Sequence, residues 1–418
     1  MIIISNGYQK FHLAWAASEA DRRGLLSVFI TCAYPTKFVR RILTACGLTT
    51  NVKIRRLLAR EEPISETRVV ALWGPELLYQ VSVRISRLPV AGHIGLKLHT
   101  MSMRWYGRSS VRIVINAAKQ GAKVYHYRAG FGHKSVIVAK RLGLITLCDH
   151  SIAHPAVLDW LITHDGRMPP INAHGKMNKV WADILRDIEL ADAVLVNSNF
   201  VKSTFINRGW NDSKLHVIYQ GVDDAFLGFT ATLPRKRHDA TEPLKLLFPG
   251  SIFNNRKGAA VLMQALALLP RDLWNLNIAG GIDPTIRTKN PTFFSDPRVS
   301  HIGTLSRSEL ARAIVDSDAV VLPSLAEGSA RVIFEALACG RYVITTPNSG
   351  SVVRDGIEGT VVPAGDPYAL ADAIKHLALI RPTLDDFGKR NAELIRSRFR
   401  QSTYGASLER LYKQLLSK

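Results

Sequence analysis

Two glutamates lie in a stretch of small residues in the last third of the chain, SLAEGSARVIFEALACG (324–340). The stretch follows a buried apolar run and predicts a turn, then a helix that opens near Gly328 and closes at Gly340. Backbone N–H groups at such a helix start can approach a phosphate closely. The small residues that allow this approach are Gly328, Ser329 and Ala330. Glu327 on the turn and Glu335 further on would suit two neighbouring hydroxyl-bearing groups, such as a hexose and a ribose. Alone, the pair equally fits a helix-capping acid beside a solvated one.

A basic pair follows a strand and a glycine turn in FPGSIFNNRKG (248–258). Open α/β sheets bind ligands beyond the carboxyl ends of their strands, so Lys257 should reach a diphosphate placed against the 327–330 turn. A buried diphosphate needs compensating charge, and the chain has no DxD motif in a convincing loop. We therefore expect Lys257, Arg256 and helix N-termini to stabilise a leaving group without a metal or another cofactor. The alternative is a solvated pair at the start of the helix 259–268.

The first half of the chain offers weaker signals for a site. Gly7 follows the first predicted strand in SNGYQKFH (5–12) and could bring backbone close to a ligand. His150 and His154 follow another strand in DHSIAHP (149–155), where a histidine could bond to a sugar hydroxyl or to a transferred proton. A histidine at a strand end is more often structural. We nevertheless expect His150 to face the site.

The elements that must position these residues alternate short β-rich runs with amphipathic stretches, which predicts parallel α/β architecture. The predicted strands are 2–5, 26–31, 123–127, 144–149 and 193–198 in the first half, and 244–250, 276–281, 319–324 and 342–346 in the second. Predicted helices include 13–23 and 133–142. The stretch 35–116 mixes basic amphipathic patches with aromatic residues and yields no strand order.

A chain of 418 residues favours two domains. A basic, proline-containing and aperiodic segment separates the two sets of strands and has the composition of a linker. The predicted units are an N-terminal Rossmann-like domain (1–223), a linker (224–243), a C-terminal domain (244–400) and a C-terminal helix (401–418).

Composition indicates an ordinary globular protein, with 47% hydrophobic and 21% charged residues. The four cysteines are far apart and have no metal-ligand spacing, and the apolar start is short for a secretory signal. Both features favour a cytoplasmic location. The net charge is +21, and residues 36–141 hold 20 Lys/Arg against 4 Glu and no Asp. Such a surface attracts an anionic membrane leaflet or nucleic acid, unless it is simply solvated.

Three stretches together resemble the retaining glycosyltransferases of family 4, which have the two-domain GT-B fold. They are 187–226, similar to the family's closing segment of the first domain, 249–258, similar to its phosphate turn, and 303–366, similar to its donor-site region. Residues 35–120 match little, as expected of the acceptor side. The resemblance implies two Rossmann-like domains facing a cleft, with the C-terminal helix packing back toward the first domain.

The resemblance also implies roles for individual residues. Glu327 and Glu335 match the family's pair of acids, the first contacting the donor sugar and the second the ribose, and Lys257 matches its diphosphate lysine. His150 stands at the catalytic histidine position. The remaining implied donor contacts are Gly7, Gly250, Arg256, Thr304, Leu305, Gly328, Ser329, Ala330 and Arg331. Ser251 departs from the family, which usually has arginine directly after the turn glycine.

The function implied is metal-independent transfer of a hexosyl unit from a UDP- or GDP-sugar, with retention. The basic first domain suggests a glycan or lipid-linked acceptor at the cytoplasmic leaflet, in envelope polysaccharide or glycolipid synthesis. Three alternatives remain open: a binding-only relative, for which Ser251 is a hint; a nucleic-acid-binding α/β protein, which lacks recognisable nucleic-acid motifs; and a sugar-nucleotide epimerase of the same fold, whose motifs match less well.

Overall fold

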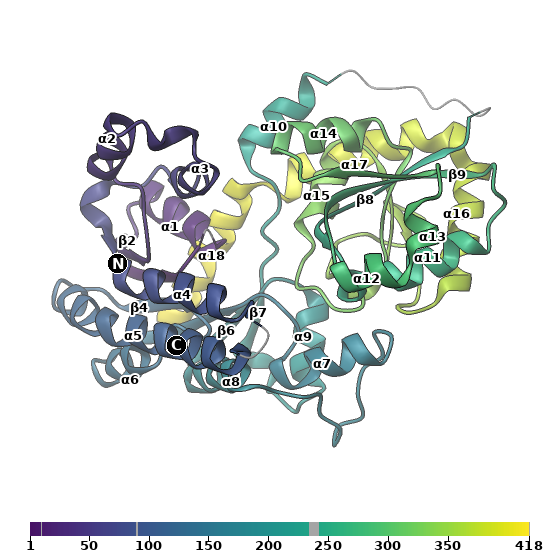
Figure 1. Ribbon diagram of the computed structural model, residues 1–418. Coiled ribbons are helices and arrows are strands. Elements are labelled where there is room, and N and C mark those ends of the chain that lie inside the picture. The colour runs from purple at the N-terminus through teal and green to yellow at the C-terminus, as the bar shows by residue number, and fades with distance from the viewer. Residues whose placement is uncertain (10, 89–90, 234–241, 418) are drawn as a thin grey trace.

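The computed structural model describes residues 1–9, 11–88, 91–233 and 242–417 and has two α/β domains, seen side by side in Figure 1. Each domain is built on one sheet, with seven strands in the first and six in the second. Neighbouring strands in both sheets pair in parallel. The predicted pair of Rossmann-like domains is confirmed.

The central strands of each sheet are those that the sequence predicts. In sheet order, the first sheet contains β3 (Val69–Ala71), β2 (Leu26–Thr31), β1 (Ile2–Gly7), β4 (Val124–Arg128), β5 (Ile145–His150), β6 (Ala193–Val196) and β7 (Leu215–Val217). The second contains β10 (Val299–Gly303), β9 (Trp274–Ile282), β8 (Leu244–Phe253), β11 (Ala319–Leu322), β12 (Tyr342–Thr345) and β13 (Gly359–Val361). The strands not predicted are the four edge strands, β3, β7, β10 and β13. They are short and largely half-buried, so they lack the apolar runs of central strands.

The first sheet is covered on both faces because its strands alternate between two cores. Ile2 and Ile4 of β1 pack in one core, while Ile3 packs in the other. The helices of this domain are α1 (Leu13–Arg22), α2 (Lys37–Ala45), α3 (Val52–Leu58), α4 (Trp73–Ile85), α5 (Gly92–Lys119), α6 (Lys134–Arg141), α7 (Pro155–Thr163), α8 (Lys179–Leu190) and α9 (Asn199–Ile206). The stretch 35–116 is thus mainly helical.

The second domain has the same layered plan. Its helices are α10 (Asp224–Ala231), α11 (Ala259–Ala267), α12 (Pro284–Lys289), α13 (Pro291–Phe294), α14 (Arg307–Val315), α15 (Arg331–Ala338), α16 (Pro367–Ile380) and α17 (Leu384–Arg398). The segment predicted as a linker begins with α10, because Asp223 caps that helix by accepting from Phe226 N, and Phe226 is buried in the core of the second domain. The rest of that prediction falls largely on 234–241, outside the described residues.

The chain crosses between the domains twice, and the two crossings lie side by side. Val222 N donates to Phe399 O, and Gln401 N donates to Val222 O. A Cβ on Gly221 would overlap the Phe399 carbonyl, so this close approach requires glycine. Beyond the second crossing, α18 (Gln401–Leu416) returns to the first domain and packs on α1 through residues such as Tyr404 and Leu408, as predicted (Figure 1).

Candidate active site

A cavity of about 420 Å³ lies at the carboxyl ends of the second sheet's strands, beside the start of α15. Most residues predicted to bind a donor line it. They are Gly250, Ser251, Lys257, Thr304, Leu305, Glu327, Ser329, Ala330, Arg331 and Glu335, together with Ala279, Gly280, Leu310 and Val332. The structure therefore brings together chain segments that are about 85 residues apart at their extremes. Parallel strands feeding loops to one sheet edge explain this convergence.

An ion pair occupies one wall of the cavity. Lys257 Nζ lies 2.6 Å from Glu327 Oε1, and Arg256 Nη1 lies 2.9 Å from the same oxygen. Lys257 is only 7% exposed. Burial alone would raise the pKa of Glu327, but the two cations outweigh burial and hold this pKa below its ordinary value. Two cations thus meet one carboxylate, leaving a net positive charge where an anion could bind.

Glu335 lies on α15 and has a different environment. Burial raises the pKa of Glu335 above its ordinary value, and the nearby Arg331 and Arg307 offset this only in part. Arg307 Nη2 lies 3.3 Å from Glu335 Oε1, and its Nη1 pairs with Asp223. No sequence motif singles out Arg307, although it lies only two residues after Leu305. Asp223 is buried in this pair.

The loop before α15 differs from the predicted helix start. The helix begins at Arg331, so Glu327 to Ala330 form a loop. Ala330 N donates to Ser349 O and Glu327 N donates to Asn348 O, which fixes the loop to the segment after β12. The Ala330 amide is thereby already used, so the amides of Ser329 and Arg331, two residues of the cavity lining, are the candidates to meet a phosphate.

Gly328 lies where this loop meets the first domain. Ser198 Oγ donates to Gly328 O, and a Cβ on Gly328 would overlap the carbonyl oxygen of Ser151. A second contact joins the domains close by, since Asn348 Nδ2 donates to Gly166 O at 2.7 Å. Gly328 therefore contacts the first domain directly instead of lining the cavity.

The glycine turn predicted after the first strand of the second domain is a bulge within that strand. Strand β8 runs through Gly250 and Ser251 to Phe253, and its register against β9 shifts between Pro249 and Ile252. A Cβ on Gly280 of β9 would overlap the Gly250 carbonyl, so both strands approach closely here. Ser251 opens to the cavity at this bulge.

The histidines of the first domain are more enclosed than expected. His150 is 4% exposed, its Nε2 lies 3.3 Å from Ala153 O, and its ring meets Phe205 edge-on. Burial lowers the pKa of His150 to about 4, so this side chain is neutral at neutral pH. His154 caps α7 by accepting from Ala156 N. Neither histidine is among the residues that line the cavity beside α15.

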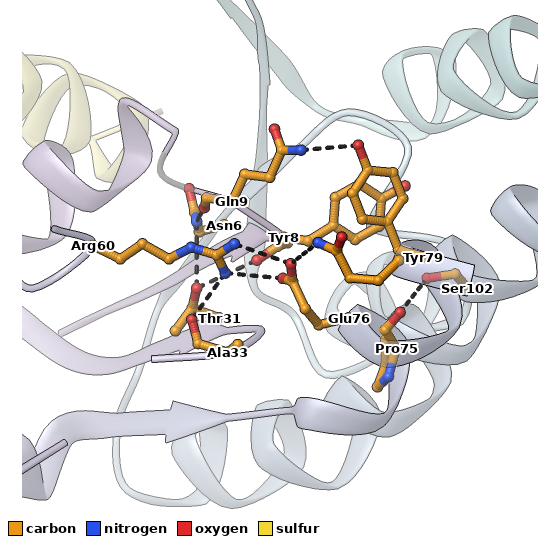
Figure 2. Close-up of polar contacts among 12 residues, drawn as sticks. Asn6, Tyr8, Gln9, Thr31, Ala33, Arg60, Pro75, Glu76, Tyr79 and Ser102 are labelled. Atoms are coloured by element: carbon orange, nitrogen blue, oxygen red, sulfur yellow. Dashed lines mark hydrogen bonds and ion pairs between the residues drawn. The ribbon is translucent and has the colours of Figure 1, made fainter. Parts of the chain in front are cut away.

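The rim of the first sheet holds a polar cluster that the sequence did not reveal (Figure 2). Tyr8 stacks on Tyr79 of α4 with ring centroids 4.0 Å apart, and Gln9 Nε2 donates to Tyr79 OH. Arg60 and Glu76 form a bidentate pair with both N···O distances at 3.0 Å. Gly7, predicted to contact the donor, lies against the Phe131 ring at this rim and is not among the residues that line the cavity at α15. The residues of this cluster are spread over positions 6–79 and form no local sequence motif from which the cluster could be predicted.

Comparison with known proteins finds a family similar to the second domain. Residues 243–379 match the model of the family described as "Glycosyl transferases group 1". D-inositol 3-phosphate glycosyltransferases of Mycobacterium tuberculosis and Mycobacterium bovis are 30% identical over 232 residues. This match covers 51% of the chain and 45% of each relative, so the chain spans less than half the length of these relatives.

Solved structures extend the likeness to both domains. A glycosyltransferase from Rickettsia africae aligns with a TM-score of 0.62 at 16% identity, over 99% of this chain and 98% of its own. Sucrose-phosphate synthase from Thermosynechococcus elongatus gives 0.62 at 18% identity over both whole chains, and Anabaena HepE in complex with UDP gives 0.59 at 15% identity over 99% of this chain and all of its own. These likenesses show the fold. The chain thus has the two-domain GT-B architecture, and residues 243–379 of its C-terminal domain are similar to the group 1 glycosyl transferases.

Proposed function

We propose that this protein is a retaining glycosyltransferase that moves a hexosyl unit from a UDP- or GDP-sugar to a glycan or lipid-linked acceptor, without a metal. The observation that carries the proposal is the ion pair of Lys257 and Glu327 on the cavity wall, to which Arg256, outside the lining residues, adds a second cation. The names of the relatives agree with it, since the mycobacterial proteins are called glycosyltransferases and HepE was solved with UDP-glucose.

The leaving group would be a nucleoside diphosphate, and its growing negative charge needs partners. Lys257 is buried beside the cavity, where a cation acts strongly because little water screens it. Negative charge develops on the phosphate oxygen as its bond to the sugar carbon breaks. Lys257 and Arg256, which pair with Glu327, would then also stabilise the charge on that oxygen. The acceptor hydroxyl then bonds to the same face of the sugar carbon, and its proton passes to the leaving diphosphate.

The carboxylates would orient the donor. Glu327 keeps its charge because its pKa is lowered, so it can accept hydrogen bonds from sugar hydroxyls. Glu335, Thr304 and Leu305 line the same cavity. Glu335 would accept a hydrogen bond from a ribose hydroxyl, and the nucleotide base would lie beside Thr304 and Leu305. His150 would act from the first domain as a neutral partner of the acceptor or sugar, in keeping with its lowered pKa.

Donor hydrolysis tests this function directly. Purified protein is incubated with a panel of UDP- and GDP-sugars, with and without EDTA, and released diphosphate is measured. Mg²⁺ in such sites is often held by one or two carboxylates and the substrate's phosphates, so the EDTA arm is needed to decide the metal question. We expect turnover that survives EDTA, is lost in Glu327→Ala and falls by about 10²–10³-fold in Lys257→Ala.

Two outcomes would contradict the proposal in different ways. Turnover abolished by EDTA and restored by Mg²⁺ would overturn metal independence alone. No turnover, together with no thermal stabilisation by any nucleotide, would overturn the enzymatic function and favour a binding-only protein. For His150, a His150→Gln variant should lose transfer to acceptor while it keeps its unfolding temperature, whereas a purely structural histidine would show the reverse.

A further inference from the structure

Helices α4 and α5 expose apolar side chains in regular rows. On α4, the row is Trp73, Leu77 and Val81, four residues apart, and Leu77 is 62% exposed. On α5, Met101 and Trp105 repeat the spacing, and Met101 is 56% exposed. Residues four apart share one face of a helix. Each helix therefore presents an apolar row to the outside of the first domain.

The two rows lie side by side because the helices pack antiparallel. Trp105 covers Gly74 at the start of α4, and Ser102 Oγ donates to Pro75 O. At the other end, a Cβ on Gly95 would overlap Ser86. Figure 1 shows α4 and α5 lying alongside each other on the outer side of the first domain. We call the exposed face of residues 73–88 and 91–112 the α4–α5 surface.

Positive charge surrounds these rows. Residues 73–119 contain seven Lys/Arg and one acid, Glu76, which is buried in its pair with Arg60. Among the seven, Arg104 pairs with Asp183. The exposed basic side chains of the α4–α5 surface are Arg84, Arg87, Lys97, Arg108 and Arg112. Exposed apolar residues flanked by basic ones are typical of elements that lie on an anionic membrane.

We propose that the α4–α5 surface docks on an anionic lipid bilayer, with its apolar rows in the headgroup region and its basic residues on lipid phosphates. Within the described residues, every helix is too short or too polar to cross a membrane, so this contact would be peripheral. A second copy of the chain is a poorer occupant, because two copies of this surface would bring like charges together. The excess of positive charge selects the anionic leaflet.

The surface also connects to the proposed function, on which this part of the inference rests. Tyr79 of α4 and His99 of α5 both contact Tyr8 at the rim of the first sheet. The same two helices thus present the α4–α5 surface outward and the rim cluster inward. A lipid-linked acceptor held in the bilayer beneath this surface would have its sugar end close to that rim.

Vesicle co-sedimentation tests the docking without relying on turnover. The full chain is mixed with vesicles of neutral phosphatidylcholine, alone or with anionic phosphatidylglycerol, at 0.15 M and 1 M salt. We expect binding that requires the anionic lipid and weakens at 1 M salt, where the Debye length falls to about 3 Å. Each basic residue near the bilayer contributes about fivefold to partitioning, so Arg84→Glu/Arg108→Glu should bind at least tenfold more weakly.

A second variant isolates the apolar rows. Leu77→Glu/Met101→Glu should lose binding at both salt concentrations, whereas the matched pair Leu379→Glu/Lys389→Glu, exposed on the second domain, should bind as wild type. All three should keep wild-type donor hydrolysis in solution and wild-type unfolding. Binding that ignores lipid charge, or that survives in both α4–α5 variants, would overturn the proposal. Self-association abolished by Leu77→Glu/Met101→Glu, without vesicle binding, would assign the surface to a second copy.

Discussion

Replacing Lys257 by alanine probes the electrostatic centre of the donor cavity. Lys257 Nζ lies 2.6 Å from Glu327 Oε1, and the buried lysine acts where solvent screening is weak. Removing one fixed group that stabilises developing charge lowers kcat by about 10²–10³-fold, or about 2.7–4 kcal/mol. We expect a loss of that size in kcat/KM for donor hydrolysis. Arg256, 2.9 Å from the same oxygen, should prevent a larger one.

The same substitution should have a smaller effect on folding. Breaking a buried ion pair costs about 3–5 kcal/mol when the remaining charge is left alone. In Lys257→Ala, Glu327 still pairs with Arg256, so we expect the free energy of unfolding to fall by about 1–3 kcal/mol. Because the pKa of folded Glu327 is lowered, its stabilisation is full above the unfolded pKa of about 4.3 and is lost as pH falls through the folded pKa. The stability difference between Lys257→Ala and wild type should shrink in that acidic window.

The assay combines diphosphate release with chemical denaturation over pH 3–7, and Lys375→Ala, an exposed lysine of α16, serves as the control. The control should match wild type in both measurements. A folded Lys257→Ala protein with kcat/KM within threefold of wild type would refute the role of Lys257 at the leaving group. A stability difference that grows as pH falls below 4 would refute the assigned direction of the Glu327 shift.

Three further substitutions test other contacts of the site. Because burial raises the pKa of Glu335, its ionisation destabilises the fold as pH rises through that value, so Glu335→Gln should raise the unfolding temperature at pH 7 in scanning fluorimetry. It should also weaken UDP or GDP binding by about 10–100-fold in calorimetry, since a hydrogen bond to a charged group is lost. Arg307→Ala should lower the unfolding temperature by about 2–4 °C, because Asp223 and Glu335 lose a shared partner. Gly328→Ala should abolish turnover and increase the radius of gyration in X-ray scattering, since its Cβ would overlap the Ser151 carbonyl; an unchanged radius would contradict the close contact.

Local patterns were enough to predict the central part of the fold. Buried parallel strands are continuous apolar runs, and all nine runs identified in the sequence became strands of the two sheets. Edge strands such as β3 and β13 are half-buried. Their side chains are partly exposed to solvent, so these strands carry no continuous apolar run. Helix α5 was missed for a related reason. Its 28 residues expose apolar rows and bury small polar ones such as Ser102 and Ser110, which obscures the usual amphipathic period.

The convergence of these residues on one cavity was predictable because they come from short segments with local signatures, such as the loop that carries Glu327. The partners of these residues were harder to foresee. Arg307 reaches Glu335 and Asp223 only through the packing of α14 beside α15 and α10, and no spacing along the chain encodes that geometry. The enclosure of His150 by Phe205 likewise depends on how α9 packs against β5.

Gly328 belongs both to the loop that carries Glu327 and to the contact between the two domains. Both features require a glycine at this position. The loop holds Glu327 at one end and the start of α15 at the other, while Ser198 Oγ donates to the Gly328 carbonyl from the first domain. A side chain at Gly328 would separate the domains and shift Glu327 relative to Lys257 in the same step. The two crossings of the chain between the domains are bonded to each other at Val222 and Phe399. Binding of a donor that orders this loop should therefore also favour the closed contact between the domains.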